Sequence, residues 1–257
     1  MNPQLRRRLA SAALIVGFFV AWQLICLAFG IKDIVLPRPT QIVYAFWTQL
    51  PGIMPHAAQT LYTTLLGFAL GIVSGVLIGA LVGSSRLAYD VAYPLLIGFS
   101  SIPKVAVVPI FVLWFGAGTV PAVLTAMILC IFPIVVNVAT GLATTEPELE
   151  DVMRALRASR FEILTNVGLP RTMPYFFASL KVAVTQAFVG TVIAETVASN
   201  RGIGNLMMIA SSNFDVPLVF AGLLVLAVLG VALYVIFSFI EVRVTGWALR
   251  KDQFAMG

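Results

Sequence analysis

Residues 61–83, LYTTLLGFALGIVSGVLIGALVG, form an uncharged run of apolar and small residues. A helix that crosses the hydrocarbon core of a bilayer needs about 20 such residues, so the run predicts a membrane span from Leu61 to Val82. Glycine recurs at every fourth position, which places one helix face where a neighbouring backbone approaches closely. That face is lined by Gly67, Gly71, Gly75, Gly79 and Gly83. It packs either within the chain or against a second subunit.

The composition of the whole chain agrees with a membrane protein. Of its 257 residues, 60% are hydrophobic and 11% charged, whereas soluble domains carry about 25% charged residues. This deficit excludes most soluble enzymes. The 16 Lys and Arg against 11 Asp and Glu are dispersed, which argues for cytoplasmic loops and against nucleic-acid binding. Two cysteines in apolar runs and one histidine predict no disulfide framework and no metal site.

Five more runs bring the predicted spans to six. The first follows Arg6, Arg7 and Arg8 and could be a signal peptide, but no convincing cleavage site precedes Lys32, so an uncleaved helix is the preferred interpretation. The third contains three prolines and Lys104. The predicted spans are Leu9–Phe29, Leu61–Val82, Ala88–Phe115, Val120–Leu142, Phe176–Val197 and Val216–Ile240.

The distribution of basic residues orients these spans, because cytoplasmic loops carry the excess of Lys and Arg. With the N-terminus inside, the inner segments hold Arg6, Arg7, Arg8, Arg86, Arg154, Arg157, Arg160, Arg171, Arg243, Arg250 and Lys251. The outer segments hold only Lys32, Arg38 and Arg201. The predicted fold is therefore all-α and polytopic, with six transmembrane helices and both termini cytoplasmic.

The inner segment between spans four and five predicts two short helices. Thr145 with Glu148, and Ser159 with Glu162, have the spacing of capping boxes. An apolar stripe at i, i+3, i+4 and i+7 follows the first box, formed by Leu149, Val152, Met153 and Leu156. The stripe either packs on the membrane end of the bundle or docks into a groove of a partner.

This segment resembles the EAA loop of ABC importer permeases, which has an acidic residue, two small residues, a glycine at a bend and a Leu-Pro ending. Asp151 takes the acidic position, Met153 replaces a small residue, and Arg157 replaces the glycine, which usually lies where a left-handed conformation favours it. The residues that the resemblance assigns to ATPase coupling are Glu150, Asp151, Val152, Met153, Arg154, Leu156, Arg157, Ser159, Leu169 and Pro170.

Three further stretches, LPRPTQIVYAF (36–46), SIPKVAVVPIFVLWFGAG (101–118) and IAETVASNRGIGNLM (193–207), are similar to nitrate/sulfonate/taurine-type permeases. The resemblance implies a type I ABC importer transmembrane domain in a bacterial inner membrane, over residues 58–241 with the coupling loop at 144–174. Residues 1–57 would then hold the N-tail, first span and external segment, and residues 242–257 a cytoplasmic C-tail. The implied partners are two cytoplasmic ATPases, a second permease copy forming a homodimer, and an external solute-binding protein.

Polar residues within spans are candidates for the transport pathway. Lys104 either attracts an anionic solute or snorkels or forms an ion pair. Glu195 either faces the pathway or pairs with Arg201, and Asn137 is a weaker pathway candidate. The single histidine, His56, is expected at the surface.

The chain has no G-x-x-x-x-G-K-[ST] phosphate loop. We therefore expect no enzymatic activity and no cofactor bound by this chain, with ATP and Mg²⁺ on the partner ATPase. A gradient-driven transporter is the alternative, but it should show internal repeats and mid-membrane acids or bases. A membrane-embedded enzyme would need clustered His, Asp or Glu. The solute, a small anion or a vitamin precursor, is left open by the sequence.

Overall fold

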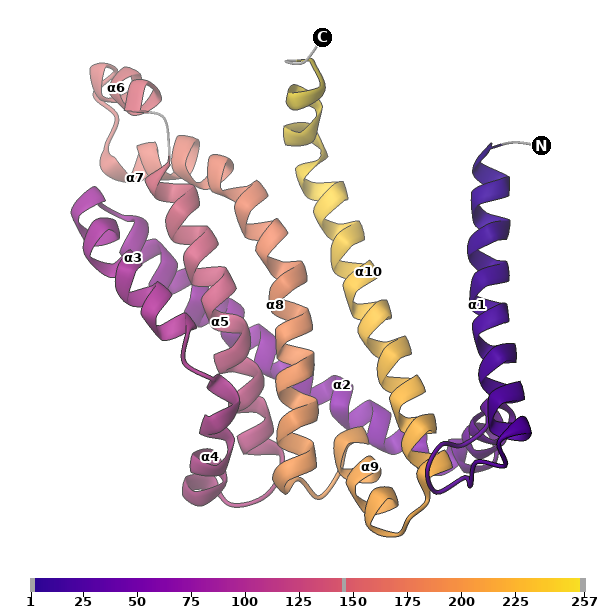
Figure 1. The fold of residues 1–257 in the computed structure, drawn as a ribbon. Coiled ribbons are helices and arrows are strands. Elements are labelled where there is room, and N and C mark those ends of the chain that lie inside the picture. The colour runs from indigo at the N-terminus through magenta and orange to yellow at the C-terminus, as the bar shows by residue number, and fades with distance from the viewer. Residues whose placement is uncertain (1–2, 145–146, 255–257) are drawn as a thin grey trace.

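The computed structural model describes residues 3–144 and 147–254, in which all regular structure is helical (Figure 1). In chain order the helices are α1 (Pro3–Ala28), α2 (Pro39–Gly83), α3 (Arg86–Ser100), the 3₁₀ helix η1 (Lys104–Val107), α4 (Val108–Phe115), α5 (Thr119–Ala143), α6 (Pro147–Ala155), α7 (Arg160–Ile163), the π-helix η2 (Leu164–Gly168), α8 (Leu169–Ala198), α9 (Ile203–Ser212) and α10 (Val216–Phe254).

The predicted all-helical membrane fold is confirmed. Within the described residues, α1, α2, α5, α8 and α10 are each long and apolar enough to cross a bilayer. The third predicted span is a pair of helices, Arg86–Ser100 and Lys104–Phe115, bent by 78°. Pro103 lies at this bend, where a proline removes a backbone donor and so favours a break. Counting the bent pair as one span gives the six that the sequence predicts.

Helix α5 forms the centre of the bundle, between α2 and α8 (Figure 1). Ala126, Cys130 and Ile134 on α5 are fully buried. The glycine face of α2 lies against this helix of the same chain: a Cβ added at Gly75 would lie 2.8 Å from Ile134 Cγ2, and one at Gly83 would lie 2.9 Å from the Ala139 carbonyl oxygen. Gly67, Gly71 and Gly79 are equally tight against α5. We call this contact the glycine seam.

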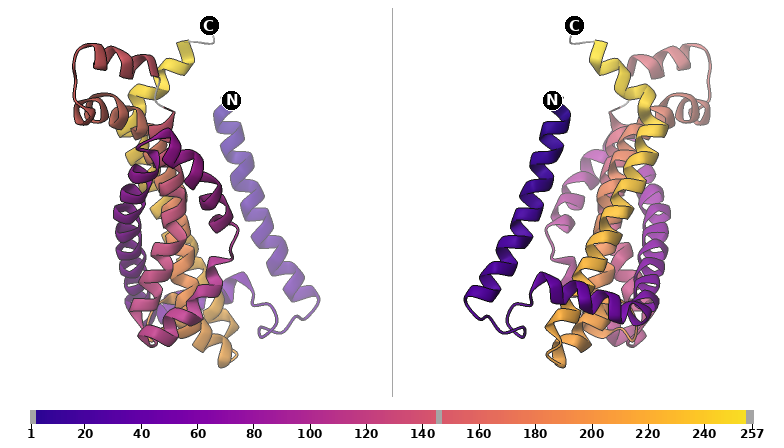
Figure 2. Two further views of the ribbon diagram at one scale, coloured as in Figure 1. Left: turned by 90° about the vertical axis from the view of Figure 1, so that its left-hand side faces the viewer. Right: turned by 90° about the vertical axis from the view of Figure 1, so that its right-hand side faces the viewer.

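Helix α2 is longer than the predicted second span, because it begins at Pro39 instead of Leu61. Pro51 and Pro55 lie inside it, where prolines usually end or kink a helix. Figure 2 shows the first part of α2 crossing the lower end of the molecule before the rest rises along the bundle. Much of the expected external segment is therefore helical.

Helix α1 stands apart from the bundle (Figure 2). It contacts α10 near its lower end, where the Trp22 and Phe220 rings are 5.8 Å apart between centroids. An ion pair joins Lys181 of α8 to Glu241 of α10 at 2.5 Å. The beginning of α1, the end of α10 and helices α6 and α7 all lie toward one end of the molecule (Figure 1). The described ends of the chain are therefore on the same side as the basic inner segment between α5 and α8, which we call the basic loop.

Candidate functional site

Helices α6 and α7 form a hairpin that projects from the bundle at the end where the termini lie (Figure 1). The bend falls at Arg157, whose φ of 61° is left-handed. The N–H of Ala158 donates to the Met153 carbonyl (3.0 Å), and that of Arg157 donates to the Arg154 carbonyl (2.9 Å). These two bonds are those of a Schellman motif, which ends a helix and satisfies its last carbonyls. Arg157 thus occupies a conformation that favours glycine.

The second capping box is present in full at the start of α7. The Ser159 backbone N–H and hydroxyl donate to Glu162 Oε2 at 2.7 and 2.8 Å, and the Glu162 N–H donates to Ser159 Oγ at 3.3 Å. These bonds favour the ionised carboxylate, so they lower the pKa of Glu162 below its usual value. The first box lies outside the described residues because it includes Thr145.

The four residues of the apolar stripe of α6 differ in their exposure. Leu149 and Met153 are half-buried, whereas Val152 is 57% and Leu156 74% exposed. On the opposite face, Asp151 and Arg154 form an exposed ion pair at 3.3 Å. Of the other predicted coupling residues, Leu169 and Pro170 are exposed at the start of α8, and the side chain of Glu150 lies outside the described residues. The hairpin therefore presents an apolar edge with no cover from the described part of the chain.

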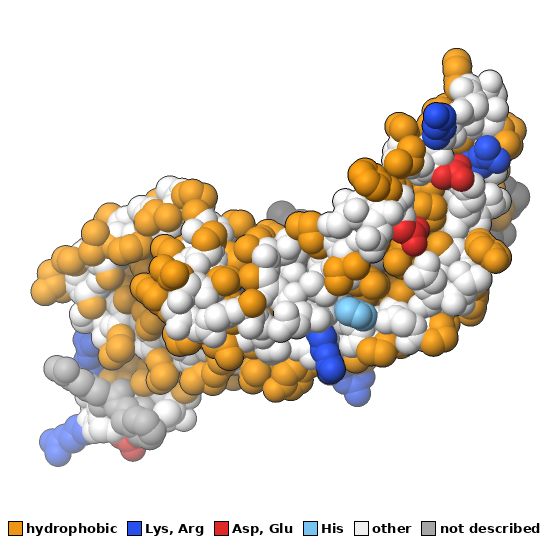
Figure 3. Space-filling view, turned by 90° about the horizontal axis from the view of Figure 1, so that it is seen from below, with side chains coloured by type: hydrophobic (Ala, Val, Ile, Leu, Met, Phe, Trp, Pro, Cys, Tyr) orange, Lys and Arg blue, Asp and Glu red, His pale blue; other side chains and the backbone are white. Residues whose placement is uncertain are grey.

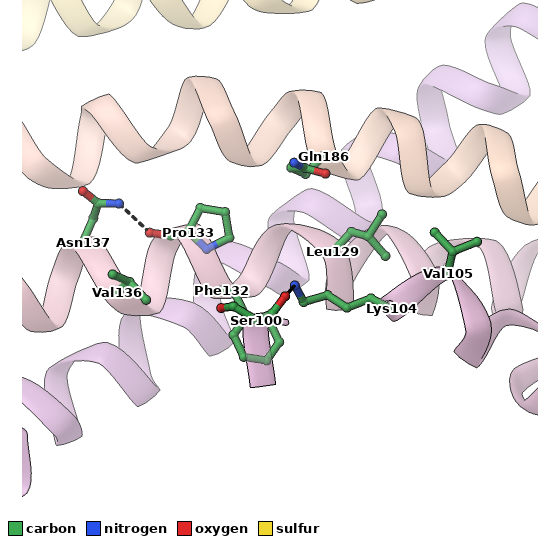
Figure 4. Close-up of a pocket in the computed structure, with 9 residues that line it drawn as sticks. All are labelled: Ser100, Lys104, Val105, Leu129, Phe132, Pro133, Val136, Asn137 and Gln186. Carbon is green, nitrogen blue, oxygen red and sulfur yellow. Dashed lines mark hydrogen bonds between the residues drawn. The ribbon is translucent and has the colours of Figure 1, made fainter. Parts of the chain in front are cut away.

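A pocket of about 410 Å³ lies between η1, α5 and α8 (Figure 4). Lys104 and Asn137 both line it, together with Gln186 of α8, which no sequence pattern had indicated. The Lys104 ammonium donates to the Ser100 carbonyl at 3.2 Å and lies 4.6 Å from the Phe132 ring centroid. Asn137 donates to the Pro133 carbonyl at 2.8 Å. The pocket thus combines one ammonium and two amides with an aromatic ring.

Glu195 lies outside this pocket, and neither expectation for it describes its contacts. It is 1% exposed, and its Oε2 accepts from the Thr60 hydroxyl (2.8 Å) and the Gly204 N–H (3.1 Å). Its other oxygen, Oε1, is buried and has no hydrogen-bond partner within the described residues, where no ion pair with Arg201 forms either. His56, expected at the surface, is half-buried and accepts from the Gly202 N–H at 3.1 Å. The residues that contact one another here are far apart in the sequence, so no local sequence pattern predicts these hydrogen bonds.

Among the described residues, no cluster of three or more His, Cys, Asp or Glu could hold a metal ion. The geometry is that of a helical membrane bundle with an apolar hairpin at one end and a polar pocket between its helices. Residues 67–246, which include both features, match the family described as "Binding-protein-dependent transport system inner membrane component". The chain belongs to this family.

Relatives of this permease cover most of its length. A riboflavin transport system permease of Chloroflexus aurantiacus is 36% identical over 89% of this chain and 86% of the relative. A formylaminopyrimidine transport permease of Halalkalibacterium halodurans is 32% identical over 91% and 93%. A putative aliphatic sulfonates permease of Escherichia coli is 30% identical over 87% and 86%.

A solved structure of the methionine ABC transporter MetNI, in an inward-facing conformation, contains a chain of the same fold. The TM-score is 0.59 at 18% identity, over 76% of this chain and 95% of that chain. This similarity confirms the type I importer fold. The permease is thus an inner-membrane transport subunit of an ABC system with ATPase and binding-protein partners, in which a separate ATPase hydrolyses ATP.

Proposed function

We propose that the permease couples ATP hydrolysis to solute import through its α6–α7 hairpin. The exposed apolar edge of Val152 and Leu156 carries this proposal, because apolar helix faces of this kind bind in a groove of a partner. The hairpin projects at the end of the molecule where the basic loop and both termini lie (Figure 1), which is the side of a cytoplasmic ATPase. ATP and Mg²⁺ would bind that ATPase and not this chain.

Two copies of the permease would form the translocation path. Symmetric closed assemblies of identical chains are the common solution for oligomers. The glycine seam is already filled by α5 of the same chain, so the contact between copies would use other helix faces. This arrangement leaves the pocket of Lys104, Asn137 and Gln186 available to line the path.

The solute would be a small molecule whose oxygen atoms accept hydrogen bonds. The Lys104 ammonium and the amides of Asn137 and Gln186 offer such donors beside the Phe132 ring (Figure 4). Oxyanions such as nitrate and sulfonate share this chemistry with carbonyl-bearing vitamins and vitamin precursors such as riboflavin and formylaminopyrimidine. The relatives of this permease include transporters named for both kinds of solute.

The composition and energy source of the purified complex test this proposal. The permease is tagged, expressed with its partner ATPase, and weighed by native mass spectrometry, with two permeases and two ATPases expected. In proteoliposomes, uptake of the solute should require Mg-ATP, and it should persist when ionophores remove the ion gradients. Uptake that stops with the gradients and ignores ATP would support the gradient-driven alternative, and recovery without any ATPase would contradict the proposal.

A further inference from the structure

Side chains of other helices satisfy the first backbone donors of α9. Helix starts leave N–H groups without partners inside the helix. Here the N–H of Gly202 donates to His56 Nδ1 at 3.1 Å, that of Ile203 to Thr60 Oγ1 at 2.8 Å, and that of Gly204 to Glu195 Oε2 at 3.1 Å. His56 and Thr60 belong to α2 and Glu195 to α8. We call these three acceptors and the start of α9 the external clasp.

The external clasp is closely fitted, and all of it except the half-buried His56 is deeply buried. Thr60 and Ile203 have no exposed surface, and Glu195 is 1% exposed. A Cβ added at Gly202 would overlap the Glu195 carboxylate, and one at Gly204 would lie 2.5 Å from the Val192 carbonyl oxygen. Glycines at these positions therefore let α9 approach the carboxylate. A carboxylate at a helix N-terminus is also favoured by the helix dipole.

Helix α8 links the external clasp to the hairpin at the other end. It has 30 residues from Leu169 to Ala198, which corresponds to about 45 Å at 1.5 Å per residue. Its first residues follow α7 and η2, and Glu195 lies in its last turn. The α9 end of the molecule carries few charged side chains among hydrophobic ones (Figure 3). One continuous helix thus connects the cytoplasmic hairpin to α9.

We infer that Glu195 is a positioning residue that, with Thr60 of α2, holds the start of the external helix α9, so that movement of α8 at the hairpin also moves α9. The inference rests on the proposed function, because the ATPase must move the hairpin. Coupling of this kind needs a contiguous physical connection between two distant sites. The buried hydrogen bonds between Glu195, Thr60 and the start of α9 provide the last step of that connection.

A reporter cysteine on α9 tests the inference. Ser212, the last residue of α9, is exposed, and the native Cys26 and Cys130 are fully buried, so Ser212→Cys adds one accessible thiol. The permease–ATPase complex in proteoliposomes is labelled with a membrane-impermeant maleimide, before and after Mg-ATP and orthovanadate trap the ATPase. We expect trapping to change the labelling rate at least about fivefold, the lower end of ordinary coupling between sites.

The clasp variants and one control decide the outcome. Thr60→Val and Glu195→Leu should abolish the change in rate, and Thr60→Ser, which keeps the hydroxyl, should retain it. Thr64→Val is the matched control: Thr64 is equally buried one turn along α2, and its hydroxyl has no hydrogen-bond partner within the described residues. If Glu195→Leu does not fold, the nearly isosteric Thr60→Val decides alone.

Two results would overturn the inference: a labelling rate at residue 212 that trapping does not change in the unmodified clasp, or an undiminished change in Thr60→Val. Native mass spectrometry of the same sample separates this failure from that of the proposed function. If the complex keeps its ATPases while the reporter does not respond, the clasp inference alone is wrong. If no ATPase is present, the proposed function fails.

Discussion

At the scale of single residues, Arg157 occupies a position that its residue type does not favour. A left-handed conformation costs a non-glycine residue about 1 kcal/mol, and Arg157 has a φ of 61° at the bend of the hairpin. We predict that Arg157→Gly stabilises the hairpin by up to about 1 kcal/mol. Slower amide hydrogen exchange at residues 156–158 would show this gain.

The matched control is Arg157→Ala, which removes the guanidinium but keeps the Cβ that strains the bend. It should leave exchange at these amides close to that of the unmodified chain. Equal protection by alanine and glycine would show that the arginine side chain, and not the backbone conformation, sets the stability of the bend.

Lys104 gives a second prediction at this scale. Its ammonium lies in the pocket without a carboxylate among the lining residues, so it can bind an oxygen of the solute. If the solute is an anion, Lys104→Gln should raise the KM for uptake by about tenfold, which corresponds to the loss of roughly 1.4 kcal/mol from one charge-assisted hydrogen bond. Lys104→Arg, which keeps the charge, should have a smaller effect. Unchanged uptake kinetics in Lys104→Gln would remove Lys104 from the solute path.

At the scale of elements, the cap of α7 predicts a pH dependence of the hairpin. Hydrogen bonds from Ser159 lower the pKa of Glu162 in the folded hairpin, whereas an unfolded glutamate has a pKa of about 4.3. A group with a lowered folded pKa stabilises the fold above its unfolded pKa, and this contribution is lost as the pH falls through the folded pKa. The protection of the amides of residues 160–166 against hydrogen exchange, measured relative to their intrinsic exchange rates, should therefore not depend on pH near neutrality. It should decrease only below about pH 4.

Glu162→Gln tests the origin of this dependence, because its amide does not titrate. The acid-induced loss of protection should disappear in this variant, while Glu148→Gln on α6 should keep it. If Glu162→Gln still shows the same loss in acid, another group controls the hairpin.

The glycine seam gives a prediction about two packed helices. A Cβ at Gly75 would lie 2.8 Å from Ile134 Cγ2 and 3.3 Å from the Ile131 carbonyl oxygen, so a larger side chain must separate α2 from α5. Gly75→Leu should cost at least about 1–3 kcal/mol, the usual range for overpacking. A lower thermal unfolding temperature and a smaller monodisperse fraction in detergent would show it. Gly17→Leu in α1, where nothing lies within 4 Å, is the control, and equal behaviour of the two variants would argue against the seam.

At the scale of the whole molecule, the sequence predicted the features that depend on composition and local spacing. Predominantly apolar runs of about 20 residues must be helical in a bilayer, because every backbone group needs a partner. The six spans followed from this requirement. The second capping box followed from the i, i+3 spacing of Ser159 and Glu162. The resemblance to a known loop indicated a bend near this position, but Arg157 in place of the usual glycine left its conformation unpredicted.

Features that depend on contacts between distant segments were not predicted. Helix α2 begins at Pro39, well before the predicted second span, and continues through Pro51 and Pro55. The external clasp joins residues 56–60 to residues 195–204, and no local pattern pairs them. Gln186 lines the pocket only because α8 packs beside α5. An isolated histidine or glutamate in a sequence carries no sign of such a partner.

The most direct test of the account is whether the exposed edge of the hairpin holds the ATPase. Leu156→Asp places a carboxylate on that edge, and Ala155→Asp places the same charge one residue away, outside the stripe. Co-purification of the ATPase with tagged permease is measured for both variants. We predict that Leu156→Asp loses at least about nine-tenths of the bound ATPase, because a charge buried in a partner's groove costs several kcal/mol, whereas Ala155→Asp retains most of it. Full retention of the ATPase by folded Leu156→Asp would contradict the account.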